Sequence, residues 1–249
     1  MFLQNQKKTD YIIFPDNTFS CLQIKQKYSG KCYDFDNVKK ITKKKCNRYY
    51  FSNKINKIYF KGTDTTKNNT NIRKNLEEKS KKNNWLNVNL NAWQNYIEPY
   101  KFCEYKGLLN LPGHYPWSNR FKYLFLMKSL VVNIDVYTIN LNPKYMDYPY
   151  VSFINYIVKK NKHYINLNMI YYRTSYATSK KYEKYIMEKK KNESDKIINK
   201  LTEIYHNIDC DKYKKIINDG YKKVRKLSME NIYEYISECI SENSKIIND

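Results

Sequence analysis

Short apolar segments alternate with helix-like segments along the middle of the chain, and this rhythm limits the fold more than any other feature. Five short strand-like runs are expected, at residues 57–62, 86–90, 107–113, 130–135 and 163–168. Between them, residues 71–83 have the composition of a polar helix, and residues 119–129 carry apolar side chains at helical spacing. Strands that alternate with helices are typical of βαβ units. The sequence therefore predicts an α/β fold with a parallel sheet.

The two ends of the chain have a different character. Residues 1–55 are poorly patterned, with a short strand expected at 11–19 and an exposed basic run at 39–48. Three helices are expected towards the C-terminus, at residues 180–206, 210–226 and 229–246. Ser228 is a suitable N-cap for the last of them.

Basic residues dominate the charge of this chain. The 249 residues include 46 Lys and Arg against 24 Asp and Glu, so the formal net charge is +22. Such a charge favours binding to nucleic acid. However, the lysines are spread along the whole chain and accompany many Asn, Ile and Tyr residues, as an A/T-rich coding bias would produce. We therefore expect solvated lysine faces and no specific nucleic-acid partner.

The sequence contains no segment that resembles a membrane span or a secretory signal. No stretch approaches the roughly 18 apolar residues that a membrane helix needs, and the N-terminal residues lack an apolar core. We therefore expect no transmembrane segment and a cytoplasmic location. None of the six cysteines forms a Cys-x-x-Cys pair, and no histidine has zinc-finger spacing. Buried free thiols and no bound metal are expected.

The segment at residues 113–132 has the richest chemistry, because it combines a strand end, a glycine turn and a helix start. Gly113 permits a sharp turn and a close approach by a ligand, and Ser118 could cap the helix. Arg120 could then hold two phosphate oxygens with its forked guanidinium. Three nearby rings could stack on a base or a sugar: His114, Tyr115 and Trp117. The alternative is an ordinary strand–helix turn with an exposed arginine.

A second segment, at residues 60–75, also combines a strand, a glycine turn, hydroxyl side chains and a helix. Thr63 could donate a hydrogen bond to a phosphate or sugar oxygen, and Arg73 falls in the following helix. Taken alone, this segment is more typical of a plain polar loop than of a binding site.

Residues 105–132 resemble the signature of glycosyltransferase family 90, which includes protein O-glucosyltransferases and capsule-associated xylosyltransferases. The shared pattern is a Tyr-Lys stretch, Asn-x-x-Gly, a short loop, Ser-x-Arg-Phe-Lys-x-Leu and a Ser-Leu-Val strand. Residues 60–63, FKGT, are similar to that family's Phe-Arg-Gly-Ser, with Lys61 in place of the usual arginine. Weaker similarity extends to residues 12–19 and 217–236.

This resemblance implies a GT-B architecture, in which a Rossmann-like domain with C-terminal helices holds the UDP-sugar. Residues 56–249 would form that domain, and residues 1–55 would be a remnant of the acceptor-side domain. The implied activity is metal-independent transfer of glucose or xylose from a UDP-sugar to a hydroxyl of a protein or glycan. The alternative is an inactive relative that binds a nucleotide sugar or a protein partner. No cofactor is implied, because the UDP-sugar is the donor substrate.

By position in these motifs, Thr63 and Arg73 would contact the nucleotide sugar, and residues 114–120 would wrap it. Arg120 would stabilise the charge that develops on the departing diphosphate. The full set of expected UDP-sugar-binding residues is Thr63, Arg73, Gly113, His114, Tyr115, Trp117, Ser118, Asn119 and Arg120.

The chain departs from the family pattern at three places, one of which is the segment at residues 135–200, where the family's usual aromatic and acidic landmarks are missing. The aspartate that serves as catalytic base in the family lies upstream of the segment matched by residues 12–19, so the catalytic residue of this chain stays unassigned. Cys103 matches a cysteine that is disulfide-bonded in secreted members, but Met127 occupies the partner position.

Overall fold

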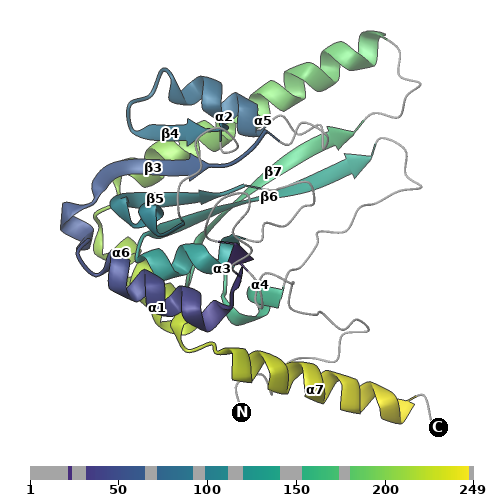
Figure 1. Cartoon of the computed structure of the whole chain (residues 1–249). Coiled ribbons are helices and arrows are strands. Elements are labelled where there is room, and N and C mark those ends of the chain that lie inside the picture. Colours follow the sequence, from purple (N-terminus) through teal and green to yellow (C-terminus); the bar gives the residue numbers. More distant parts are fainter. Residues whose placement is uncertain are drawn as a thin grey trace.

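The computed structural model describes residues 22–23, 32–64, 72–91, 99–111, 120–140, 153–173 and 180–246. A five-stranded sheet with helices on both faces forms its centre (Figure 1). Its strands are β3 (Ile55–Lys61), β4 (Leu86–Asn89), β5 (Tyr105–Asn110), β6 (Leu130–Asn140) and β7 (Ile165–Arg173). Every neighbouring pair in this sheet is parallel, so the predicted α/β class with a parallel sheet is confirmed. The arrangement is compatible with a Rossmann-like fold.

The order of the strands creates a switch point inside the sheet. Across the sheet the order is β4-β3-β5-β6-β7, which is 2-1-3-4-5 when the five strands are numbered along the chain. The chain passes from β3 to one side and later crosses back to start β5 on the other side. In doubly wound sheets, ligands bind outside the carboxyl ends of the strands at such a switch. The carboxyl ends of β3 and β5 are therefore the place to look for a site.

Alternation along the strands divides the apolar residues between two cores. Ile58 and Phe60 face a core with α2 (Ile72–Ser80) and α5 (Lys180–His206). Tyr59 faces the opposite core. That second core is built with α1 (Phe35–Cys46), α3 (Phe121–Leu124), η5 (Phe125–Met127) and α4 (Phe153–Ile157). In Figure 1, α2 and α5 lie above the sheet and α1, α3 and α4 lie below it.

The remaining elements are short or lie near the ends of the chain. They are β1 (Leu22–Gln23), β2 (Cys32–Tyr33), η2 (Phe51–Asn53), η4 (Pro99–Glu104), α6 (Asp211–Arg225) and α7 (Met229–Ile246). The three helices predicted at the C-terminus are therefore confirmed as α5, α6 and α7. The strand predicted at 11–19 lies outside the described residues. No helix in the described ranges combines the length and the apolar character that a membrane crossing needs.

The helix predicted at residues 119–129 is much shorter in the structure. Its α-helical part, α3, has four residues, and the three-residue 3₁₀ turn η5 follows it. Lys128 then adopts a left-handed backbone conformation, with a φ angle of 52°. This conformation ends the helical segment and turns the chain into β6 within two residues.

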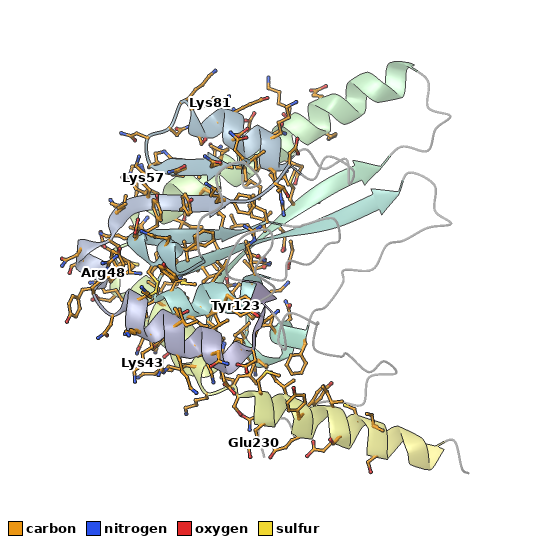
Figure 2. All side chains as sticks on the ribbon, in the orientation of Figure 1. Lys43, Arg48, Lys57, Lys81, Tyr123 and Glu230 are labelled. Carbon is orange, nitrogen blue, oxygen red and sulfur yellow. A yellow bond between two sulfur atoms is a disulfide. The ribbon has the colours of Figure 1, made fainter. Side chains whose placement is uncertain are left out.

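The basic run at residues 39–48 lies mostly in the amphipathic helix α1, and most of its basic side chains are exposed, as expected. Asp34 caps this helix by accepting a hydrogen bond from the Asn37 N–H at 2.7 Å. Val38 and Cys46 are buried in the same core as α3. Lys43 lies exposed on the outer side of the helix (Figure 2).

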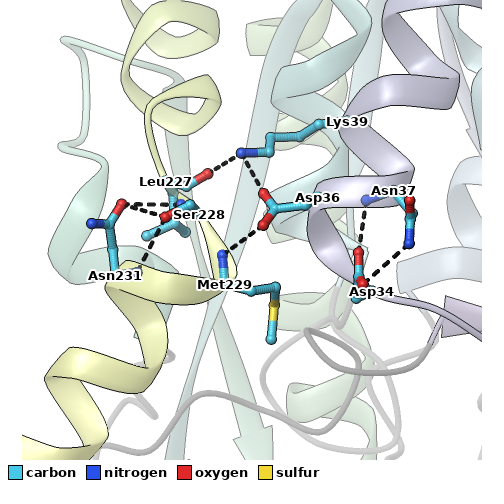
Figure 3. A network of polar contacts seen from close by, with 8 residues as sticks. All are labelled: Asp34, Asp36, Asn37, Lys39, Leu227, Ser228, Met229 and Asn231. Atoms are coloured by element: carbon cyan, nitrogen blue, oxygen red, sulfur yellow. Dashed lines mark hydrogen bonds and ion pairs between the residues drawn. The ribbon is translucent and has the colours of Figure 1, made fainter.

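A polar network joins α1 to the start of α7 (Figure 3). Ser228 accepts a hydrogen bond from the Asn231 N–H at 3.1 Å, and the Asn231 side chain accepts one from the Ser228 N–H at 3.2 Å. This reciprocal cap confirms the predicted role of Ser228. Asp36 accepts from the Met229 N–H at 3.0 Å and pairs with Lys39 at 2.7 Å. The first turn of α7 is therefore tied to the first turn of α1.

Cys46 and Cys103 form a disulfide that connects α1 to η4, so the expectation of free thiols is wrong for this pair. Their Cα atoms are 5.6 Å apart, within the range that the bond requires. The Met127 sulfur lies 3.2 Å from the Cys103 sulfur. Cys210 is a free cysteine. Disulfides persist in oxidising compartments, so this bond gives no support to the expected cytoplasmic location.

Candidate anion-binding site

Two arginines from different segments meet at the carboxyl ends of β3 and β5. Arg73, in the first turn of α2, donates hydrogen bonds to the Thr63 carbonyl at 2.6 Å and to the Leu111 carbonyl at 3.4 Å. Arg120, the residue before α3, donates from Nη1 to the Lys61 carbonyl. Lys61 and Thr63 lie at and just beyond the end of β3, and Leu111 directly follows β5. The two guanidinium groups therefore occupy the switch point of the sheet.

Phe60 lies beside both guanidinium groups. Its ring centroid is 5.1 Å from Cζ of Arg73 and 4.7 Å from Cζ of Arg120. The ring is buried, so these cation–π contacts form away from water, where they are strongest. Phe60 therefore fixes the distance of both cations from the end of β3.

Gly62 leaves room for this arrangement. A Cβ atom at this position would lie 2.8 Å from the Phe60 ring and 3.0 Å from Nη2 of Arg120. The Gly62 N–H donates to the Asn89 carbonyl at 3.0 Å, so the backbone is held in place by β4. A larger residue would have to displace the ring or the guanidinium group.

Both arginines are desolvated cations. Only 4 % of Arg73 is exposed, and its Nε atom has no hydrogen-bond partner among the described residues. Burial lowers the pKa of Arg73 to about 10, against an opposing effect of Asp64. Burial, and then the charge of Arg73, lowers the pKa of Arg120 to about 10. Both groups consequently remain protonated at neutral pH and repel each other.

No carboxylate of the described residues neutralises this pair by forming an ion pair with Arg73 or Arg120. Buried charges are costly unless a partner of opposite charge accompanies them. Guanidinium groups present N–H donors in a fork that matches phosphate or carboxylate oxygens. The arrangement is therefore suited to a bound anion with several oxygens.

The structure brings together three of the residues that were expected to bind a ligand: Thr63, Arg73 and Arg120. Thr63 contributes its backbone carbonyl to the contact with Arg73. The other six expected residues lie outside the described part of the chain, and they are Gly113, His114, Tyr115, Trp117, Ser118 and Asn119. Because α3 has four residues, its helix dipole contributes little to an anion site, contrary to the expectation from sequence. The two guanidinium groups carry the positive charge instead.

The sequence reasoning missed a row of asparagines on the neighbouring strands. Asn110, Asn133 and Asn166 occupy matching positions in β5, β6 and β7. The Asn110 side chain donates to Asn133 Oδ1 at 2.6 Å, and Asn133 donates to Asn166 Oδ1 at 2.8 Å. Asn110 and Asn133 are each 5 % exposed. An asparagine that interrupts an apolar strand, as in LLN and VVN, was the available signal.

Three further polar side chains that could have suggested a site have structural roles: Asp34, His163 and Asp209. Asp209 pairs through both oxygens with Lys106 at 2.7 Å, and Asp34 caps α1. The His163 ring accepts a hydrogen bond from the backbone N–H of Lys159 at 2.8 Å. A group of three or more His, Cys, Asp or Glu side chains that could hold a metal was not found among the described residues.

The comparisons with known proteins add no relative. The chain matches no model of a known protein family, and no curated protein sequence matches it. The fold and the site together define a doubly wound α/β protein with two cations at its switch point, a buried Arg73 and a partly buried Arg120.

Proposed function

We propose that this protein binds the diphosphate of a UDP-sugar between Arg73 and Arg120 and transfers the sugar to a hydroxyl acceptor. The observation that carries the proposal is the pair of desolvated, protonated guanidinium groups at the switch between β3 and β5, with no carboxylate of the described residues within ion-pair distance. In this proposal the parallel sheet is the nucleotide-sugar half of a GT-B architecture.

Two features support a nucleotide diphosphate over a smaller anion. The site has two cationic groups, which suits the charge of two linked phosphates. Doubly wound parallel sheets also bind nucleotides at this topological position. The motif resemblance at residues 60–63 and 105–132 supports uridine and a transferable sugar.

The chemistry of sugar transfer gives the arginines a role. The bond between the anomeric carbon and the diphosphate oxygen breaks, and its electron pair leaves with the diphosphate. The acceptor oxygen forms the new bond to that carbon and loses its proton to a base that we leave unassigned. Guanidinium groups that are already in place stabilise the charge growing on the diphosphate, without the reorganisation that water would need.

Calorimetry with UDP, UMP and uridine tests the binding step. We expect UDP to bind more tightly than UMP, and uridine to bind weakest. Arg120→Ala and Arg73→Ala should each weaken UDP binding by about 10- to 100-fold, the range for a charge-assisted hydrogen-bonding group. Arg120→Lys should restore part of the affinity, because it keeps the charge and loses the fork.

The chain offers a matched control for its high net charge. Arg48 is exposed and donates to the Tyr49 hydroxyl at 2.8 Å, away from the switch point. Arg48→Ala removes the same charge from the surface and should leave the UDP affinity unchanged. Equal losses for Arg48→Ala and Arg120→Ala, or no UDP binding by the wild type, would overturn the proposal.

A second assay separates an enzyme from a binding protein. Incubation with UDP-glucose and UDP-xylose should release UDP, and the release should fall in Arg120→Ala in step with affinity. UDP binding without any release or transfer would identify an inactive binder. Tight, strongly salt-dependent binding to DNA without a response to UDP would favour a nucleic-acid partner instead.

A further inference from the structure

The asparagine row next to the arginine pair leaves one buried acceptor without a partner. Among the described residues, Asn110 Oδ1 is buried and accepts no hydrogen bond. Asn110 is the last residue of β5, and the next residue, Leu111, provides a carbonyl to Arg73. The amide therefore lies at the same carboxyl edge of the sheet as the proposed diphosphate site.

The strand alternation shows which face this amide occupies. Leu109 and Leu111 belong to the core with α2 and α5, whereas Leu108 belongs to the core with α3. Asn110 alternates with the former pair and so lies on the face that α3 covers. Arg120 immediately precedes α3. The amide is therefore on the α3 side of the edge where the two guanidinium groups meet.

A carboxylate fixes the direction of every amide in the row. Asp135 can only accept hydrogen bonds, and it accepts from Asn133 Nδ2 at 2.7 Å and from Lys160 at 2.7 Å. Asn133 must therefore direct its amino group towards Asp135 and its oxygen towards Asn110. Asn110 in turn must donate to that oxygen with its own amino group. Its Oδ1 atom is left as an acceptor that cannot be exchanged for a donor by rotating the amide.

From this polarity we infer that Asn110 Oδ1 accepts a hydrogen bond from a hydroxyl group of the bound nucleotide sugar. The inference rests on the proposed function and adds a residue that recognises the substrate. Burial without a partner is costly for an amide oxygen, and a ligand that brings a donor removes that cost. Phosphates at neutral pH are acceptors, and the uracil ring has a single N–H donor, whereas the ribose and the transferred sugar carry several hydroxyl groups. The donor is therefore assigned to a sugar hydroxyl of the ligand. That hydroxyl belongs either to the ribose or to the transferred sugar.

The test compares the wild type with Asn110→Ala by calorimetry, using UDP, UDP-glucose and their deoxy analogues. Asn110→Ala should lose about tenfold in affinity for each ligand that contains the contacted hydroxyl. The analogue that lacks this hydroxyl should bind the wild type and Asn110→Ala with equal affinity. A loss confined to UDP-glucose assigns the transferred sugar, and an equal loss for UDP and UDP-glucose assigns the ribose.

A second variant tests the polarity without removing the amide of Asn110. In Asp135→Asn the new amide can donate a hydrogen bond to Asn133, whereas Asp135 can only accept one. Each amide in the row can then rotate so that its donor and acceptor exchange places. Discrimination here is the logarithm of the ratio between the affinity for the ligand with the contacted hydroxyl and the affinity for its deoxy analogue. We expect this variant to lose at least half of the wild-type value. Its affinity for that analogue should stay within twofold of the wild type. Asn87→Ala, in strand β4 at the far edge of the sheet, is the matched control and should change neither quantity.

The outcomes separate this inference from the proposed function. If UDP binding depends on Arg120 while Asn110→Ala loses nothing, or loses equally with every deoxy analogue, Asn110 has only a structural role and the inference falls alone. Unchanged discrimination in a folded Asp135→Asn variant would also overturn it. If the wild type does not bind UDP at all, the proposed function fails and the inference falls with it.

Discussion

The guanidinium carbon of Arg120 lies 4.7 Å from the ring centroid of Phe60, so a residue just before α3 rests on a side chain of β3. This contact joins two segments that are distant in the sequence. The carbonyl of Lys61, one residue after Phe60, accepts a hydrogen bond from the same arginine. The end of β3 therefore fixes Arg120 in two ways, through a ring and through a carbonyl.

Gly62→Ala should disturb the arginine site more than the fold. The new Cβ atom would lie 3.0 Å from Arg120 Nη2 and 2.8 Å from the Phe60 ring, so one of the two must move. We expect the UDP affinity to fall by at least fivefold, because the forked geometry is lost. Calorimetry on the folded variant measures this effect.

Gly107→Ala is the matched control for this substitution. Its Cβ atom would lie 2.9 Å from Ile58 Cγ1 and 3.3 Å from Ile208, in the core and away from both arginines. It should lower the melting temperature and leave the UDP affinity of the folded protein unchanged. Equal affinity losses in the two variants would contradict a specific role for Gly62.

The sequence predicted the elements of the sheet well because their signal is local. The run at 130–135 is apolar and follows a helical segment, and such a run is typical of a buried parallel strand. The order of the strands carries no such local signal, since it depends on how the helices pack. The switch point between β3 and β5 consequently became visible only in the structure.

Most of the missed features depend on contacts between distant parts of the chain, and helix α1 is the exception. In α1 the many lysines at 39–45 make the segment look uniformly polar, so the helical spacing of Phe35, Val38 and Cys46 was not recognised. The polarity of the row from Asn110 to Asp135 depends on strand register. Arg120 was singled out from its motif, but its contact with Phe60 could not be inferred from either segment alone.

Gly220→Ala should destabilise the protein, against the usual effect of this substitution in a helix. Alanine normally stabilises a helix by about 0.5–1 kcal/mol relative to glycine. Here the new Cβ atom would lie 2.5 Å from the carbonyl oxygen of His163 and 3.1 Å from Phe125. We expect a net loss of about 1–3 kcal/mol in the free energy of unfolding, since backbone must move. Urea denaturation measures it, with the exposed Lys215→Ala in α6 as the control that should change little.

Removing the disulfide should lower stability strongly, because it closes a long loop. Cys46 and Cys103 are 57 residues apart in the sequence. The chain-entropy relation gives about 4 kcal/mol for a loop of this size. Cys46→Ala should therefore lower the melting temperature, and a reducing agent should lower that of the wild type alone. Cys210→Ala, at a free cysteine, is the control. A wild-type melting temperature that is insensitive to reduction would contradict the bond.

Asp36 should make the attachment of α7 sensitive to acid. Burial raises its pKa, but the hydrogen bonds from Lys39 and the Met229 N–H outweigh that effect and hold the pKa below its usual value. Its stabilising contribution is therefore present above pH 3.8 and is lost as the pH falls through the lowered pKa. Asp36→Asn should reduce the free energy of unfolding at pH 7 by about 1 kcal/mol and by less near pH 3. Denaturation at both pH values tests this, and an equal loss at each would contradict it.

Lys54 should give a pH dependence of the same sign, but in the alkaline range. Its amino group is buried and donates to the Met127 carbonyl at 2.7 Å and to Ser129 Oγ at 2.8 Å. Burial, and then the charge of Lys128, lowers the pKa of Lys54 from its usual 10.5 to about 7. Between pH 7 and pH 10.5, the Lys54 amino group is therefore protonated in the unfolded chain and neutral in the folded protein. Protonation favours the unfolded state across this window, so the free energy of unfolding should rise from pH 7 to pH 10.5 and stay flat below pH 7.

The variant Lys54→Met isolates this contribution from that of the other lysines. The difference in unfolding free energy between wild type and variant should shift by about 2–4 kcal/mol in favour of the wild type between pH 7 and pH 10. The exposed Lys81, labelled in Figure 2, provides the control, because Lys81→Met should show no such shift. Urea denaturation of the three proteins at both pH values measures it. Parallel pH profiles for the wild type and Lys54→Met would show that Lys54 keeps its proton throughout this range in the folded protein.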